Sequence, residues 1–120
     1  MSIRAFLLAT ITAFPLAGPA LAGNAGVIVQ NGGVSHADVA QAGAANDFTI
    51  VQGGYANRST VLQTGGHNNA MVGQMGRFSH ATVGQIGSAN GAGVFQMGPE
   101  NFAGIGQAGP WNRAILKQWP

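Results

Sequence analysis

The chain has 120 residues, no cysteine, five Lys and Arg and three Asp and Glu, with a formal net charge of +2. Without cysteine no disulfide can hold the fold, so packing and backbone pairing must stabilise it. The basic residues are scattered along the sequence, whereas nucleic-acid binding needs them clustered, which excludes nucleic acid as a partner.

Residues 1–22 have the pattern of a secretory signal peptide. A short basic start is followed by an apolar run over residues 5–16 and by an A-x-A cleavage site at Ala20 and Ala22. The apolar run is too short for a comfortable membrane span. We therefore expect the chain to be exported, with a repeat domain over residues 23–120 that does not span a membrane.

A glutamine recurs every eleven residues from Gln30 to Gln118, which gives nine copies of one unit. Six residues before each Gln stands Asn or Ser. The paired polar positions are Asn24 and Gln30, Ser35 and Gln41, Asn46 and Gln52, Asn57 and Gln63, Asn68 and Gln74, Ser79 and Gln85, Asn90 and Gln96, Asn101 and Gln107, and Asn112 and Gln118. A short fixed period indicates a solenoid or an array, in which each unit packs on its neighbours.

An aliphatic residue stands two positions before each Gln, and a small residue usually stands four positions before it, with Phe48 as the exception. The aliphatic positions are Ile28, Val39, Ile50, Val61, Val72, Val83, Val94, Ile105 and Leu116. Because alternate residues of a strand share a face, the polar, small, aliphatic and Gln positions should all point to one side. We predict that this side is the inward face and that the aliphatic residues form the core.

A glycine stands two positions after each Gln, except in the last unit, where Pro120 takes its place. The glycines are Gly32, Gly43, Gly54, Gly65, Gly76, Gly87, Gly98 and Gly109. We predict that they turn the chain. Eleven-residue repeats also suit a right-handed coiled coil, but a glycine in every unit costs a helix about 1 kcal/mol each. The β-branched aliphatic positions argue against a helix as well.

The predicted fold is all-β: a β-solenoid of nine strand–turn units, with two strands and therefore 22 residues in each coil. Successive coils should stack with parallel strands about 4.7–4.9 Å apart. A buried amide without a partner is costly, so each inward Asn and Gln is expected to bind the identical amide of the next coil and to form a ladder. The alternative is that these residues only cap turns within a monomer.

The first unit begins at Asn24, next to the predicted cleavage site, and already has the full pattern. Solenoids that remain monomeric carry atypical capping repeats, and unpaired strand edges template further strands. We therefore expect the chain to polymerise into a cross-β fibre. Bulky or basic outward residues, among them Trp111, Arg113 and Trp119, surround the last unit, which leaves open whether that unit caps the stack or docks another protein.

The unit resembles the curlin repeat, whose pattern is S-x5-Q-x-G-x-x-N-x-A-x3-Q. The match is complete at Ser79, Gln85, Gly87, Asn90, Ala92 and Gln96, and Ser35, Gln41, Gly43, Asn46 and Gln52 match with Phe48 in place of Ala. The other units match with Asn in place of the leading Ser, so the resemblance covers residues 24–120. The spacing here is strictly eleven residues, without the extra turn residue often found between curlin repeats.

This resemblance implies a structural subunit of an extracellular curli-type amyloid fibre in the biofilm matrix of a Gram-negative bacterium, with roles in adhesion and cell aggregation. The implied partners are further copies of the chain, a curli-type secretion channel, and a nucleator or major-subunit paralogue. Both the major-subunit and the nucleator role remain open. No cofactor is implied.

No catalytic or metal-binding constellation accompanies the repeats, so we expect neither an enzyme nor a metal site. His36 and His80 share an outward column with Arg58 but lie two coils apart, about 9–10 Å, too far to share an ion. Their protonation should slow assembly between about pH 7 and 5. An alternative function is a secreted monomeric β-solenoid that binds a surface, a glycan or ice, although only Thr60 and Thr82 share an outward column of the kind an ice-binding face needs.

Overall fold

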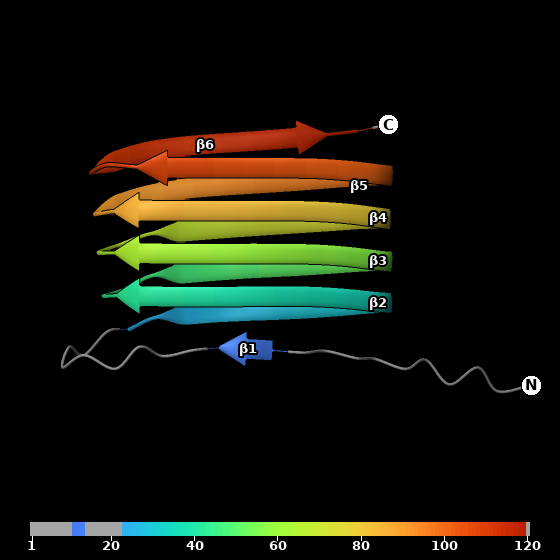
Figure 1. The fold of residues 1–120 in the computed structure, drawn as a ribbon, viewed down its shortest axis with the longest axis horizontal. Coiled ribbons are helices and arrows are strands. Elements are labelled where there is room, and N and C mark those ends of the chain that lie inside the picture. The colour runs from blue at the N-terminus through green and yellow to red at the C-terminus, as the bar shows by residue number, and fades with distance from the viewer. Residues whose placement is uncertain (1–10, 14–22, 120) are drawn as a thin grey trace, which may run out of the picture.

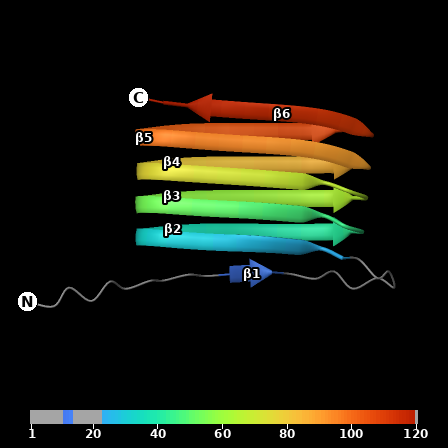
Figure 2. The same cartoon turned by 180° about the vertical axis from the view of Figure 1, so that it is seen from behind.

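The computed structural model describes residues 11–13 and 23–119 and is a parallel β-solenoid (Figure 1). One six-stranded sheet follows the chain order. Its strands are β1 (Ile11–Ala13), β2 (Ala25–Gly43), β3 (Asp47–Gly65), β4 (Asn69–Gly87), β5 (Ala89–Ala108) and β6 (Trp111–Gln118). The view from behind shows the same stacked coils, from β2 at one end to β6 at the other (Figure 2). The predicted all-β solenoid is confirmed.

Each coil contains 22 residues, because the paired residues of β2 to β6 lie 22 positions apart in the chain. Ile28 pairs with Ile50 and Gln52 with Gln74, both in parallel register. We call the segment of each coil that leads to Gln30, Gln52, Gln74, Gln96 or Gln118 the first arm, and the segment that leads to Gln41, Gln63, Gln85 or Gln107 the second arm. The two arms lie on opposite sides of a thin core.

The structure differs from the prediction in how the strands are divided. Each complete coil is one bent strand of 19 or 20 residues, because backbone pairing continues around the turn between the arms. Asn31 pairs with Gly53, and Gly32 with Gly54. The backbone groups of each turn find partners in the identical turn of the next coil, so the turn does not end the strand. Residues 25–118 therefore contain four strands of 19 or 20 residues and one of eight, and the nine units remain a count from the sequence.

The turn glycines are required by both conformation and space. Seven of the eight predicted positions have positive φ, among them Gly54 at 120° and Gly65 at 124°. A Cβ on Gly54 would overlap the carbonyl oxygen of Gly76 in the next coil. At Gly76 itself the φ is not positive, but a Cβ would overlap the carbonyl oxygen of Gly98. Only glycine permits the coils to stack this closely at the turn.

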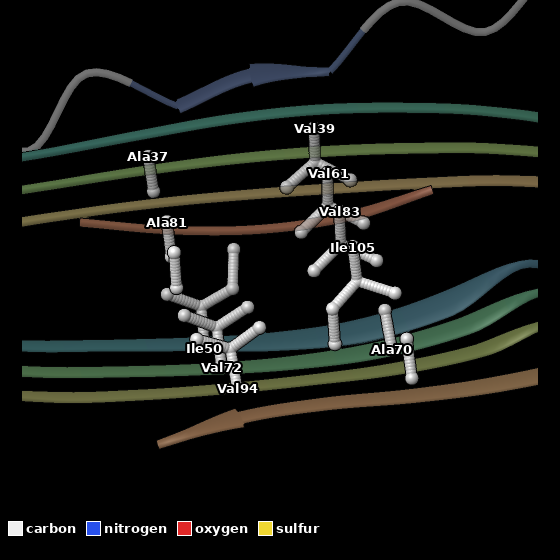
Figure 3. Close-up of a cluster of buried hydrophobic side chains, with 12 residues drawn as sticks. Ala37, Val39, Ile50, Val61, Ala70, Val72, Ala81, Val83, Val94 and Ile105 are labelled. Carbon is white, nitrogen blue, oxygen red and sulfur yellow. The ribbon is translucent and has the colours of Figure 1, made fainter. Parts of the chain in front are cut away.

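The hydrophobic core lies between the two arms (Figure 3). Val39, Val61, Val83 and Ile105 project from the second arms toward Ile50, Val72 and Val94 on the first arms. The five aliphatic residues of the middle coils, Ile50, Val61, Val72, Val83 and Val94, are fully buried. Ile28 and Leu116 belong to the end coils and are only partly buried, because each has a neighbouring coil on one side. Burial of each such side chain stabilises the fold by about 1.5–3 kcal/mol.

Beyond the solenoid, β1 pairs in parallel with β2 from Ile11 opposite Ala37 to Ala13 opposite Val39. The predicted signal peptide over residues 1–22 otherwise lies outside the described residues. Within residues 11–13 and 23–119, no helix has the length and apolar character that a membrane crossing requires.

Candidate self-assembly site: the inward amide ladders

Two columns of buried glutamines run the length of the solenoid. On the first arms, Nε2 of each Gln donates to Oε1 of the Gln in the next coil, from Gln30 to Gln118, at 2.7–2.8 Å. On the second arms the same bond runs from Gln41 to Gln107 at 2.6–2.9 Å. Within the middle coils these side chains are at most 1% exposed. In every bond the earlier coil donates and the later coil accepts, so each ladder has a fixed direction along the stack.

In six of the glutamines, Gln52, Gln63, Gln74, Gln85, Gln96 and Gln118, the amide also donates across the core. Gln63 Nε2 donates to the carbonyl of Asp47 at 2.9 Å, and Gln74 Nε2 to the carbonyl of Arg58 at 3.1 Å. In each case the acceptor lies on the opposite arm, 16 residues earlier in the chain. One amide therefore holds the next coil with one proton and the opposite arm with the other. Because its hydrogen bonds are made, a buried Gln avoids the cost of an unpaired polar group, about 1–3 kcal/mol.

At the turn between coils, asparagines form a third column. Here the later coil donates and the earlier coil accepts, which is the reverse of the glutamine ladders. The backbone N–H of Asn46 donates to Oδ1 of Asn24 at 3.0 Å, and that of Asn68 to Oδ1 of Asn46 at 3.2 Å. Asn112 Nδ2 donates to Oδ1 of Asn90 at 3.0 Å. Nδ2 of Asn46 also donates to the carbonyl of Ala42 in its own turn at 3.0 Å. Asn46, Asn68 and Asn112 thus join coils and cap turns at the same time, which combines the two predicted roles. Nδ2 of Asn90, in contrast, is buried without a hydrogen-bond partner.

The polar column that starts the second arms forms no ladder. It alternates Ser35, Asn57, Ser79 and Asn101 in register. A Ser side chain is too short to reach an amide one coil away, about 4.8 Å. The hydroxyls of Ser35 and Ser79 and Oδ1 of Asn57 are buried without a hydrogen-bond partner, while Asn57 Nδ2 donates to the carbonyl of Gly53 in its own turn at 2.9 Å. The sequence prediction of a continuous ladder does not hold at this column.

Sequence reasoning missed one member of the first-arm ladder. Ser59 is fully buried and lies between two glutamines, accepting from Gln52 Nε2 at 3.0 Å and donating to Gln74 Oε1 at 2.8 Å. In the sequence it occupies a small-residue position that is otherwise mostly Ala or Gly. The hydroxyl at a position predicted to point inward is the signal that could have identified it.

Phe48, the large residue at a small-residue position, is compensated in the preceding coil. It pairs in register with Gly26, and a Cβ on Gly26 would overlap the Phe48 ring. The Phe48 ring therefore fills the space that a side chain at position 26 would occupy. Because the two residues lie one coil apart, the sequence could have revealed this compensation.

The outward histidine column contains an acidic neighbour that the prediction omitted. Asp38 Oδ1 lies 2.9 Å from Nε2 of His36, and Asp38 Oδ2 lies 3.5 Å from the guanidinium of Arg58. One coil further, the ring of His80 stacks on Phe102 with 5.1 Å between centroids. The basic side chains of this surface therefore have an acidic and an aromatic neighbour.

The repeats of this chain are similar to a known family. The family model described as the curlin associated repeat matches residues 43–76 and again residues 60–87. Together these stretches contain all of β3 and β4, whose ladder glutamines are at most 1% exposed. No curated protein and no solved structure matches the chain.

Proposed function

Because this chain belongs to the curlin repeat family, we propose that it is a structural subunit of an extracellular curli-type amyloid fibre and that it assembles by stacking solenoid coils of successive chains. The fibre would form part of the biofilm matrix and would contribute to adhesion and cell aggregation, as the family suggests. The partners would be further copies of the chain, a curli-type secretion channel, and a nucleator or major-subunit paralogue at the surface of a Gram-negative cell.

The observation that carries the proposal is the polarity of the glutamine ladders. Each coil offers Oε1 to the preceding coil and Nε2 to the following one, and the same arrangement recurs from coil to coil. A coil from a second chain can therefore make the bonds that the next coil of the same chain makes. Head-to-tail stacking preserves this donor–acceptor order, whereas head-to-head stacking would bring donors against donors.

The buried face also fixes the register of added strands. A slip by one residue would place Val72 and Gln74 on the solvent side and outward residues in the core. A slip by eleven residues, in contrast, keeps Gln on Gln and Gly on Gly because the unit repeats. An incoming chain is therefore directed to a small set of equivalent registers, which is the property a self-templating strand stack requires.

Seeded growth tests this proposal. Residues 23–120 are diluted from denaturant into neutral buffer, and thioflavin fluorescence is followed with and without fragments of preformed fibres. We expect a lag phase that the fragments abolish, because the exposed coil at a fibre end templates the next chain. A chain that remains soluble and β-rich, with or without fragments, would contradict the proposal and favour a monomeric surface-binding solenoid.

A further inference from the structure

We propose that the outward surface of the first arms binds the same surface of a second copy, so that two coil stacks pair face to face. We call this surface the first-arm face and define it as the outward columns that begin at Val27, Val29 and Asn31. The inference rests on the proposed function, because the two stacks that pair are fibres of this chain. It adds a lateral contact that coil stacking does not require.

The first-arm face is the apolar side of the solenoid. Of the exposed large hydrophobic residues, eight lie in its three columns: Val27, Val29, Val51, Met71, Met75, Met97, Ile115 and Trp119. Met75 is 59% exposed and Val27 is 55% exposed. The outward columns of the second arms contain five such residues, Val34, Leu62, Phe78, Ile86 and Phe102. An apolar surface concentrated on one side of a solenoid marks an interaction site.

The distribution of charge favours the same face. Among the described residues, Lys117 is the only charged side chain in the three columns. The second-arm face contains Asp38 and Arg58 together with His36 and His80. Covering that face would remove water from an ion pair, which is costly, whereas covering the first-arm face buries mainly Val, Met and Phe side chains.

The size of the face requires a contact that repeats along the fibre. The three columns span five residues of each arm, about 17 Å, and five coils at about 4.8 Å span about 24 Å, which gives about 400 Å² per copy. One pair of chains would bury about 800 Å², below the roughly 1,000 Å² expected of a specific interface. In a fibre the contact recurs with every chain, so only paired stacks reach a stable contact area.

The relief and the spacing of the face identify the occupant as a second stack. Gly73 lies in register between Val51 and Phe95, and this part of the face has a hollow of about 290 Å³ bordered also by Met75 and Met97. Side chains of an opposing sheet interdigitate with such relief only if they repeat at the same strand spacing. A second copy of this chain has that spacing.

The methionines give the pairing a chemical control. Met71, Met75 and Met97, the three methionines after Met1, all lie on the first-arm face, and Met75 pairs in register with Met97. Oxidation to the sulfoxide makes each side chain polar. Mild treatment of assembled fibres with hydrogen peroxide, which transfers one oxygen atom to each sulfur and leaves water, should therefore separate the pairs. Enzymatic reduction of the sulfoxides with a dithiol as reductant, which is oxidised to the disulfide, should restore them.

The test is the mass per unit length of fibres in scanning transmission electron microscopy. The variant Met71→Gln, Met75→Gln, Met97→Gln should have half the mass per length of the wild type. The matched control Leu62→Gln, Ile86→Gln, Phe102→Gln changes the second-arm face and should leave the value unchanged. A wild-type value that corresponds to one stack, a methionine variant that remains paired, or a control that separates would overturn the inference.

A further measurement keeps the inference testable if a variant does not fold. Oxidised wild-type fibres need no substitution, and an unchanged mass per length after oxidation would count against pairing. If the chain forms no fibres, the proposed function fails and the pairing of fibres fails with it. Fibres with the mass per length of a single stack would overturn the pairing alone.

Discussion

Gln63 donates from Nε2 to Oε1 of Gln85 at 2.8 Å, and the two buried side chains join β3 to β4. Gln63 also accepts from Gln41 at 2.6 Å and donates to the carbonyl of Asp47 at 2.9 Å. One side chain thus connects three coils and both arms, and its replacement tests the ladder directly.

The variant Gln63→Ala should destabilise the solenoid and its fibres. It leaves the Gln41 donor and the Gln85 acceptor without their ladder partner, at about 1–3 kcal/mol for each buried group. The measurement is the denaturant midpoint of fibre dissociation. The control Thr64→Ala changes the exposed neighbour of Gln63 and should shift the midpoint little. Equal midpoints for the two variants would mean that the ladder contributes nothing.

The variant Gly54→Ala should disrupt stacking at the turn. Gly54 has a φ of 120°, and a Cβ would overlap the carbonyl oxygen of Gly76, so we expect a loss of more than about 1–3 kcal/mol. Gly84→Ala is the matched control, because no atom lies within 4 Å of the added Cβ. That change should be neutral or stabilise by about 0.4–1 kcal/mol. Seeded growth rates and denaturant midpoints check both variants, and a Gly54→Ala chain that grows like the control would refute the close approach.

Gly26 and Phe48 should be coupled. Gly26→Ala alone places a methyl group against the Phe48 ring, and Phe48→Ala alone leaves a cavity at a cost of about 2–4 kcal/mol for this partly buried ring. In the double variant the added methyl group occupies part of that cavity. A double-mutant cycle should therefore give a total loss smaller than the sum of the two single losses. Strict additivity would show that the two residues do not lie in register.

Asp38 should support assembly through its contact with Arg58. Its carboxylate lies 3.5 Å from the Arg58 guanidinium, on the exposed second-arm surface. Asp38→Asn removes this partner, so elongation at low ionic strength should slow modestly, as expected of an exposed ion pair of about 0–1 kcal/mol, and added salt should reduce the difference. Asp47→Asn removes the same charge from the other arm and serves as the control. Identical elongation rates for the two variants at low ionic strength would rule out the effect.

The sequence predicted the solenoid, the inward face and the 22-residue coil because these depend on spacing alone. Glycine usually weakens a strand, so the continuous pairing through Gly32 and Gly54 was not predicted; it depends on an identical turn lying one coil away. The second hydrogen bond of Gln63, to the carbonyl of Asp47, depends on the distance between arms, which the small core residues set. The ladder fails at Ser35 and Ser79 because the Ser side chain is shorter than that of Asn. The repeat pattern treats the two residue types as equivalent and therefore could not predict this failure.

X-ray diffraction from aligned fibres of residues 23–120 tests most directly whether coils of one chain continue the stack of another. Coils stacked between chains should give a meridional reflection near 4.7–4.8 Å from strands perpendicular to the fibre axis. A chain that remains a folded β-rich monomer at high concentration, or a fibre that lacks this reflection, would contradict the stacking of solenoid coils between chains.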